Sequence, residues 1–404
     1  MKYLHLVQWS PRESFGGYET IVRETALTQQ KRHSTVYVVG RRVGRNRSID
    51  SVSVSGVTYV EVSHPMRRRP SSLDVGIIGI VMLFVEIFVS LWLLTPVVWR
   101  IIRRERIDAV IFYGIHLMLM GPIVRLGGTL ALLGLEVLQK NQEVGRMSFL
   151  YWFRRLKYAC FNGIFTYTYY FYLDNRKYNN IALLKTYAPR IPVAYIPWGI
   201  DVKATSSVKS DQSLVSWKKK TSSVIILCPR RLVEEKGVRY LLEAVPMIRK
   251  KIPGAYVVFA GDGILRREME NRAKELGVAS CVRFTGFMSH EKTLQMMKAS
   301  DMIVVPSSGE ESFGMVFLEA YALGVPIVST WFGGIPNVVE QHKTGLLVAV
   351  KRPDELADSV IRIVKNMRER EQYIAAGKEL VSAKFTIEKT TDTIDRFVRT
   401  LQKA

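Results

Sequence analysis

Short apolar runs alternate with amphipathic, helix-like segments along the whole chain. In the first half, the runs predict strands at Tyr3–Gln8, Thr35–Val39, Val57–Glu61, Ala109–Tyr113, Thr129–Leu133, Phe165–Tyr170 and Val193–Ile196. In the second half, they predict strands at Val224–Cys228, Ala255–Ala260, Val282–Thr285, Met302–Val305 and Val325–Ser329. Strands that alternate with helices form parallel sheets covered on both faces. We therefore expect an α/β protein whose two doubly wound, Rossmann-like domains face a central ligand-binding cleft.

A polar segment rich in serine and lysine separates the two blocks of strands. We predict an N-terminal domain over residues 1–202, a linker over 203–222 and a C-terminal domain over 223–384. The remaining residues, 385–404, have a helical pattern. We expect this last segment to form a helix that packs back toward the N-terminal domain.

The segment 75–99 is apolar apart from Glu86 and has arginine clusters on both sides. Its length would suffice to span a bilayer, because roughly 20 apolar residues are enough. However, the predicted strands before and after it belong to one sheet, and the flanking charges show no asymmetry. A crossover helix that is simply buried on its sheet would need only one apolar face, whereas this segment is apolar on all sides. We therefore expect a helix docked on the sheet that presents its outer face to lipid.

The charge of the chain points to an anionic partner. Its formal net charge is +22, and the excess is densest in the arginine clusters of the first half. Nucleic acid is an unlikely partner because no zinc-finger, helix-turn-helix or RNP signature accompanies the charge. The residues predicted to meet an anionic membrane surface are Arg67, Arg68, Arg69, Ile77, Phe84, Phe88, Trp92, Arg100, Arg103 and Arg104.

The three cysteines lie far apart, which argues against a disulfide framework and favours a reducing compartment. The first residues have too short an apolar run for a signal peptide. With the predicted membrane surface, these features predict a cytoplasmic protein that is peripherally attached to the inner face of the cell membrane.

The most specific motif lies at residues 306–330, PSSGEESFGMVFLEAYALGVPIVST. Glu311 is predicted in the loop after a strand, Gly314 opens a helix, and Glu319 lies about two turns into that helix. The free N–H groups of a helix N-terminus suit phosphates or sugar hydroxyls. The two carboxylates can reach different parts of one polyhydroxylated ligand.

This motif resembles the Glu-x7-Glu motif of the retaining GT-B glycosyltransferases, closest to family 4, the glycosyl transferases group 1. Further matches follow in the same order along the chain, at Gly16-Gly17, 197–201, Arg231-Leu232, Lys236-Gly237, 261–263, 282–286, 333–336 and 345–348. The resemblance is dense over about 197–350 and sparse before it. It is informative about the fold and the donor chemistry, but not about the acceptor.

The resemblance implies a role for each matching residue. Arg231 and Lys236 would hold the donor diphosphate, Glu319 the ribose and Glu311 the donor sugar, so that Glu311, Arg231 and Lys236 are the expected catalytic residues. Gly17 would allow the backbone to approach the β-phosphate. The full expected donor site comprises Gly16, Gly17, Arg231, Lys236, Phe287, Met288, Glu311, Phe313, Gly314, Met315, Val316 and Glu319.

The resemblance further implies a retaining hexosyltransferase that takes its sugar from a nucleoside-diphosphate donor. We expect no metal and no other cofactor, since the chain contains no Asp-x-Asp sequence. From the apolar segment 75–99 and the arginine clusters, we expect an acceptor that is lipid-linked, a glycan or otherwise membrane-associated. Leu133 stands where the family often has a histidine, which leaves open a catalytically inactive GT-B subunit that binds nucleotide or a partner at the membrane.

Overall fold

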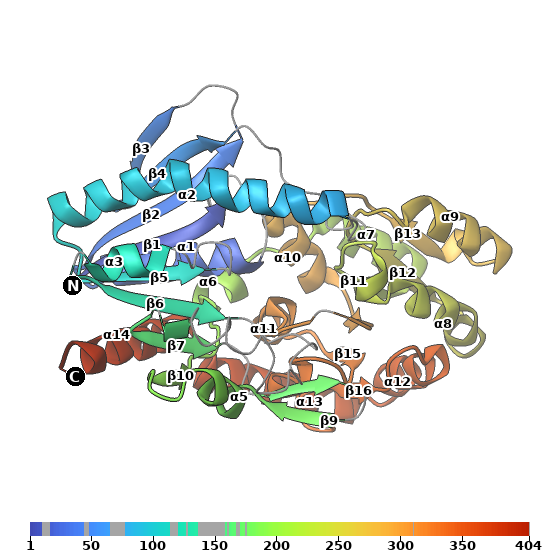
Figure 1. Cartoon of the computed structure of the whole chain (residues 1–404). Coiled ribbons are helices and arrows are strands. Elements are labelled where there is room, and N and C mark those ends of the chain that lie inside the picture. Colours follow the sequence, from blue (N-terminus) through green and yellow to red (C-terminus); the bar gives the residue numbers. More distant parts are fainter. Residues whose placement is uncertain are drawn as a thin grey trace. The chain divides into compact units, whose positions relative to one another are not determined.

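The computed structural model describes residues 1–9, 17–43, 48–64, 77–113, 120–126, 128–135, 158–159, 161–166, 170–173, 176–309 and 311–403. The chain divides into two compact units (Figure 1). The N-terminal unit comprises Met1–Tyr167, Asn180–Pro197 and Ile387–Ala404, and the C-terminal unit comprises Thr168–Asn179 and Trp198–Thr386. The chain therefore passes between units at Pro197, slightly before the predicted boundary. The short excursion 168–179 was not expected from the sequence.

The N-terminal unit is built on an eight-stranded sheet with strand order β10-β7-β6-β5-β1-β2-β4-β3. Its strands are β1 (Lys2–Trp9), β2 (Thr35–Val43), β3 (Ile49–Val54), β4 (Val57–His64), β5 (Ala109–Tyr113), β6 (Leu130–Leu135), β7 (Gly163–Thr166) and β10 (Val193–Tyr195). The neighbouring strands pair in parallel, except that β3 pairs antiparallel with β4 at the sheet edge. The sequence pattern missed β3 because its side chains are largely exposed and leave no core signature.

Five helices of this unit are described: α1 (Gly17–Lys31), α2 (Ile77–Glu105), α3 (Gly121–Leu126), α5 (Asn180–Tyr187) and α14 (Ile387–Lys403). In the second half of α2, Leu94, Val98 and Ile102 recur at helical spacing and are buried in the core. Trp92, by contrast, is 54% exposed. The predicted docking of this helix on its sheet is thus confirmed for its second half.

The first half of the predicted lipid-facing surface lies outside the described side chains. The structure places the backbone of Ile77, Phe84 and Phe88 in α2 but not their side chains, and 67–69 fall outside the described residues. Within the residues that the structure places with their side chains, no helix combines the length and hydrophobicity needed to cross a bilayer.

The C-terminal helix α14 completes the N-terminal unit, as predicted. It is fixed by a buried polar network at the centre of the sheet. Asp395 of α14 accepts hydrogen bonds from the Tyr3 hydroxyl (2.8 Å) and the Gln29 amide (3.2 Å). The side-chain oxygen Oε1 of Gln29 lies 2.7 Å from Nε2 of His5, and Nδ1 of His5 lies 3.0 Å from the Tyr113 hydroxyl. The network joins α14 to α1, β1 and β5.

The C-terminal unit contains a six-stranded parallel sheet with strand order β13-β12-β11-β14-β15-β16. Its strands are β11 (Val224–Cys228), β12 (Ala255–Phe259), β13 (Val282–Phe284), β14 (Met302–Val305), β15 (Ile327–Thr330) and β16 (Leu346–Val348). A separate antiparallel pair is formed by β8 (Tyr170–Leu173) and β9 (Arg176–Asn179). The first five strands of the sheet lie where the apolar runs predict them.

The helices of the C-terminal unit are α6 (Val202–Ser207), α7 (Gln212–Thr221), α8 (Val238–Lys251), α9 (Arg266–Glu275), α10 (His290–Ala299), α11 (Met315–Leu323), α12 (Pro353–Lys365) and α13 (Met367–Lys384). The predicted linker 203–222 is wrong, because it contains α6 and α7. Asp201 and Asp211 cap these helices by accepting hydrogen bonds from first-turn N–H groups. Capping aspartates thus start helices in a segment whose polar composition suggested a loop.

His5 makes the stability of the N-terminal unit depend on pH. Burial lowers its pKa from 6.5 to about 4. A neutral His5 therefore contributes stability that is complete above pH 6.5 and is lost as the pH falls toward 4. Between pH 6.5 and pH 4, the free energy of unfolding should fall by about 3 kcal/mol more in the wild type than in the His5→Asn variant, which has no imidazole to protonate. Denaturant titrations at several pH values measure this difference.

The exposed His33, which has a φ of 63° that asparagine tolerates, provides the control variant His33→Asn. Its pH profile should match that of the wild type. Parallel pH profiles for the wild type and His5→Asn would contradict the assignment of His5 as the group responsible.

Candidate active site

The candidate site lies at the carboxyl ends of β11 and β14. These strands are neighbours at the centre of the C-terminal sheet and run in parallel, so the loops that follow them emerge side by side. The loop after β11 ends in a short 3-10 helix, Glu234–Lys236, and the loop after β14 leads into α11. The backbone N–H groups of Ser308 and Gly309 both donate to the Glu235 carbonyl, at 3.1 and 2.9 Å. The two loops therefore form one continuous surface.

Glu311 is the centre of this surface. Its side chain is buried, and its Oε2 accepts hydrogen bonds from Nζ of Lys236 (3.3 Å) and from Oγ of Ser307 (3.1 Å). The same oxygen forms an ion pair with Arg230. Arg230 also donates from Nη2 to Oγ of Ser307, at 3.0 Å. Two cations and a hydroxyl thus surround one carboxylate oxygen.

Arg230 was not identified from the sequence, which pointed to Arg231. The Arg230 side chain is only 11% exposed, and burial lowers its pKa to about 10, so it remains charged at neutral pH. Arg231 is 55% exposed and pairs with Glu235 at 3.7 Å. The structure therefore does not bring Arg231 to Glu311, and a role for Arg231 at the diphosphate remains a prediction.

Glu319 lies on α11, as predicted, with its side chain largely buried. Its Oε1 lies 2.8 Å from Nε2 of His290, in the first turn of α10. Ser289 caps α10 by accepting a hydrogen bond from the Lys292 N–H. Sequence analysis missed His290, since only the packing of α10 against α11 brings it to the carboxylate.

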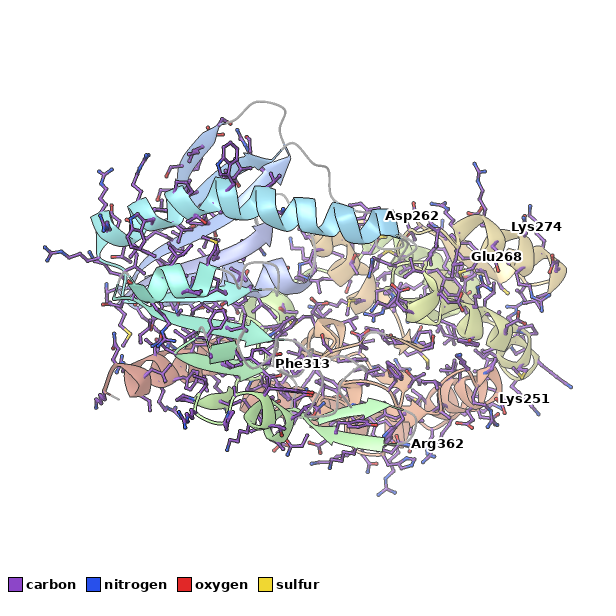
Figure 2. All side chains as sticks on the ribbon, in the orientation of Figure 1. Lys251, Asp262, Glu268, Lys274, Phe313 and Arg362 are labelled. Atoms are coloured by element: carbon purple, nitrogen blue, oxygen red, sulfur yellow. The ribbon has the colours of Figure 1, made fainter. Side chains whose placement is uncertain are left out.

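The start of α11 is shaped by glycine and by packing. Gly314 precedes the helix with a φ of 85°, a conformation that favours glycine. Phe313 is fully buried and packs against Trp198 and Phe385, with ring centroids 6.0 and 5.7 Å apart. Figure 2 labels Phe313, and it shows Lys251, an exposed residue, at the outer end of α8. Phe313 can therefore contribute only its backbone to a ligand.

The remaining predicted donor residues differ in how they are placed. Met315 and Val316 are buried in the first turn of α11. Phe287 is 68% exposed beside the half-buried Met288, before α10. Gly17 begins α1 in the N-terminal unit, and position 16 lies outside the described residues. Among the described side chains, no group of three His, Cys, Asp or Glu residues could hold a metal ion.

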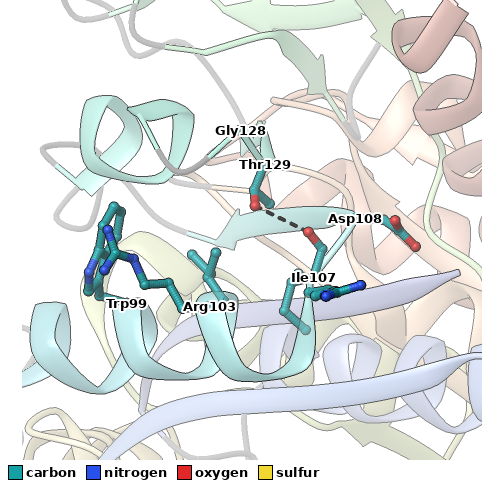
Figure 3. A pocket seen from close by; sticks show the side chains of 8 residues that line it. Trp99, Arg103, Ile107, Asp108, Gly128 and Thr129 are labelled. Carbon is teal, nitrogen blue, oxygen red and sulfur yellow. Dashed lines mark hydrogen bonds between the residues drawn. The ribbon is translucent and has the colours of Figure 1, made fainter.

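A hollow in the N-terminal unit lies at the amino ends of β5 and β6, next to the end of α2 (Figure 3). Arg103 stacks over the Trp99 ring at 4.7 Å, and Arg106 also lines the hollow. Figure 3 shows the Asp108 carboxylate directed away from the Trp99–Arg103 pair; it accepts a hydrogen bond from the Lys2 N–H at 2.8 Å. The hollow therefore presents an aromatic ring and guanidinium groups to solvent.

Most of the C-terminal unit is similar to a known protein family. Residues 210–380 match the family described as glycosyl transferases group 1. The match covers less than half of the chain, and over this stretch the predicted resemblance to the glycosyl transferases group 1 is confirmed. The matched stretch contains Arg230, Lys236, Glu311 and Glu319.

Two curated relatives illustrate the range of similarity. A GDP-mannose-dependent alpha-(1-6)-phosphatidylinositol monomannoside mannosyltransferase from Mycobacterium tuberculosis is 29% identical over 232 residues, which is 55% of this chain and 60% of the relative. A D-inositol 3-phosphate glycosyltransferase from Corynebacterium jeikeium is 36% identical over 43% of each chain. The matched regions thus span about 60% or less of the length of these relatives.

Solved structures with the same fold cover the whole chain. The sucrose-phosphate synthase of Thermosynechococcus elongatus superimposes with a TM-score of 0.78 at 18% identity, over 100% of this chain and 99% of that one. HepE of Anabaena, solved with UDP and glucose, gives a TM-score of 0.70 at 16% identity over 99% of each chain. The fold is GT-B, as predicted from the sequence.

Gly237, which follows Lys236, gives a direct test of how the two loops are held together. Its φ is 62°, and a Cβ there would lie 1.9 Å from the Pro306 carbonyl oxygen. Gly277 has a similar φ of 67° but no neighbouring atom within 4 Å. Gly277→Ala should therefore cost only the left-handed conformation, about 1–2 kcal/mol. Gly237→Ala should cost about 1–3 kcal/mol more because of the clash.

Chemical denaturation of the two alanine variants measures both costs. Equal losses of free energy of unfolding in Gly237→Ala and Gly277→Ala would contradict the close approach of the two loops.

Proposed function

We propose that this protein is a retaining, metal-independent glycosyltransferase. It would transfer a hexose from a nucleoside-diphosphate donor to a lipid-linked or other membrane-associated acceptor. The observation that carries the proposal is the buried Glu311 carboxylate with its two cations, at the carboxyl ends of β11 and β14 within the stretch that matches the glycosyl transferases group 1. Ligands of open α/β sheets bind at this edge of the sheet.

The donor would be held by groups on both loops. Lys236 and Arg231 would take the diphosphate, whose leaving group gains charge as the glycosidic bond breaks. Glu311 and the backbone of residues 313–316 would bind the sugar, and Glu319 would accept hydrogen bonds from the ribose hydroxyls. The positive charge of these two side chains supports a mechanism in which no metal ion stabilises the leaving group.

In the retaining route, the acceptor hydroxyl attacks the sugar from the face that the diphosphate leaves. The bond from the anomeric carbon to the phosphate oxygen breaks as the bond to the acceptor oxygen forms. The departing phosphate oxygen takes the proton of the acceptor hydroxyl. The protein would supply positioning and positive charge rather than a covalent nucleophile.

A membrane-associated acceptor is supported by the N-terminal unit. Arg100, Arg103 and Arg104 lie on the last turns of α2, and Arg103 lines the hollow together with Trp99. The exposed Trp92 lies on the same helix, more than two turns earlier. Aromatic and basic side chains of this kind suit the interface of an anionic bilayer. The names of several relatives also specify phosphatidylinositol lipids as acceptors. We place the protein at the cytoplasmic face of the cell membrane.

The donor site is tested by thermal and chemical unfolding with a panel of UDP-, GDP- and ADP-sugars in the presence of EDTA. A donor present at 100 times its Kd should stabilise the wild type by about 2.7 kcal/mol. Glu319→Ala and Lys236→Ala should lose this stabilisation. The control Lys274→Ala, exposed on α9, should retain it.

If one donor class stabilises the wild type but neither site variant, that result also identifies the donor to use in acceptor screens. If no donor stabilises a folded wild type in the presence of lipid, the donor site is refuted. The better hypothesis is then a catalytically inactive GT-B subunit, which was considered because Leu133 stands where the family often has a histidine. Leu133 is fully buried within β6.

The membrane surface is tested by co-sedimentation with vesicles. Each arginine near an anionic surface contributes about 1 kcal/mol, so replacing Arg100, Arg103 and Arg104 together by glutamine should weaken binding roughly 100-fold. Binding should also fall as salt is added. The control replaces three exposed lysines of the C-terminal unit, Lys219, Lys220 and Lys251, by glutamine.

The control keeps the net charge equal to that of the arginine variant and should bind nearly as well as the wild type. Equal losses in the two triple variants would indicate unspecific attraction and refute a specific surface on α2.

A further inference from the structure

The polar contacts of Glu311 fall on one of its two carboxylate oxygens. Oε2 forms an ion pair with Arg230 and accepts hydrogen bonds from Lys236 and Ser307. In the described part of the chain, no donor contacts Oε1. A Cβ at Gly314 would lie 3.4 Å from Oε1 and would clash with the Phe317 ring, so only a glycine fits at this position beside the carboxylate. One oxygen is therefore used to fix the carboxylate, and the other is left to accept a hydrogen bond from a ligand.

The two cations are not equivalent. Arg230 contacts both Glu311 and Ser307 with a planar guanidinium, which restricts its orientation. Lys236 reaches Oε2 through a flexible chain, at 3.3 Å. If Lys236 turns to a diphosphate, as the proposed function requires, the buried carboxylate still needs a charged partner. Arg230 can remain in place throughout.

Stability alone does not account for Arg230. Its Nε–H is buried and has no hydrogen-bond partner among the described residues. Leaving a buried donor unsatisfied lowers the free energy of unfolding, so such a group calls for an explanation, and a role at a functional site is one. A buried arginine with an unsatisfied donor, bonded to the residue expected to hold the sugar, is consistent with a role in ligand binding.

We propose that Arg230 is a positioning residue that orients Glu311 toward the sugar of the donor. It fixes Oε2 of the carboxylate, so that Oε1 faces the sugar hydroxyls, and it stays paired with Glu311 when Lys236 moves to the diphosphate. Arg230 therefore governs recognition of the sugar, while Lys236 governs recognition of the diphosphate. The inference rests on the proposed function and adds a residue that the sequence motifs did not indicate.

Titration calorimetry with matched ligand pairs tests the proposal: GDP against GDP-mannose, and UDP against UDP-glucose. We expect Arg230→Gln to raise the Kd of the nucleotide sugar by about 10- to 100-fold, because a charge-assisted contact is lost. The Kd of the matching nucleoside diphosphate should change by less than about threefold. Arg230→Lys, which keeps the charge but not the planar geometry, should lose less than Arg230→Gln. The control Arg272→Gln, exposed on α9, should bind both ligands like the wild type.

A double-mutant cycle with Glu311→Gln tests whether Arg230 acts through Glu311. If it does, Arg230→Gln adds little to the loss already caused by Glu311→Gln. Additive losses would overturn the proposal, as would equal weakening of the nucleoside diphosphate and the nucleotide sugar, which would assign Arg230 to the diphosphate. The proposal would also be overturned if Arg230→Gln or Glu311→Gln bound the nucleotide sugar as tightly as the wild type does.

Circular dichroism and the denaturation midpoint establish that each variant is folded. If Arg230→Gln does not fold, the selectivity of Arg230→Lys between the sugar and diphosphate ligands decides the question. The two proposals fail in different ways. A wild type that binds no ligand of either pair refutes the proposed function and this inference with it, whereas a wild type that binds and an Arg230 variant without sugar selectivity refute this inference alone.

Discussion

A buried carboxylate must be matched by positive charge, and this requirement organises the candidate site. Glu311 lies at the end of a parallel sheet, where burial would raise the free energy of its ionised form unless cations were close. The loop after β11 supplies them, because β11 and β14 are neighbours and their carboxyl ends meet. The arrangement depends on strand order as much as on the residues themselves: inserting another strand between β11 and β14 would separate the acid from its cations.

The sequence predicted the fold well where burial is strong. The strands β5 and β14 are entirely buried and appear as continuous apolar runs. Prediction failed where burial is weak or local hydrogen bonds decide the structure. The edge strand β3 is exposed, and α6 and α7 begin at capping aspartates within a polar segment. Such features have no hydrophobic period for a sequence pattern to detect.

The site was predicted in part for the same reason. The Glu-x7-Glu motif pointed to Glu311 and Glu319, and the separate match at Arg231-Leu232 and Lys236-Gly237 pointed to Lys236. Both motifs lie where strands end and helices begin, and these positions are visible in the sequence. The motifs could not show which of two adjacent arginines turns inward, since that depends on the path of the chain after β11. His290 was missed because its contact with Glu319 joins α10 and α11 across 29 positions of sequence. Long-range packing of this kind leaves no local pattern.

The position of α14 has a consequence for how the chain folds during synthesis. The first strand of the N-terminal unit, β1, precedes the C-terminal unit, but its Tyr3 pairs with Asp395, 392 positions further along the chain. Gln29 of α1 donates to the same carboxylate. The C-terminal unit lies almost wholly between these points and can close first. The N-terminal unit, whose first strand is synthesised before the C-terminal unit, is therefore completed only after it, and its sheet lacks α14 in the meantime.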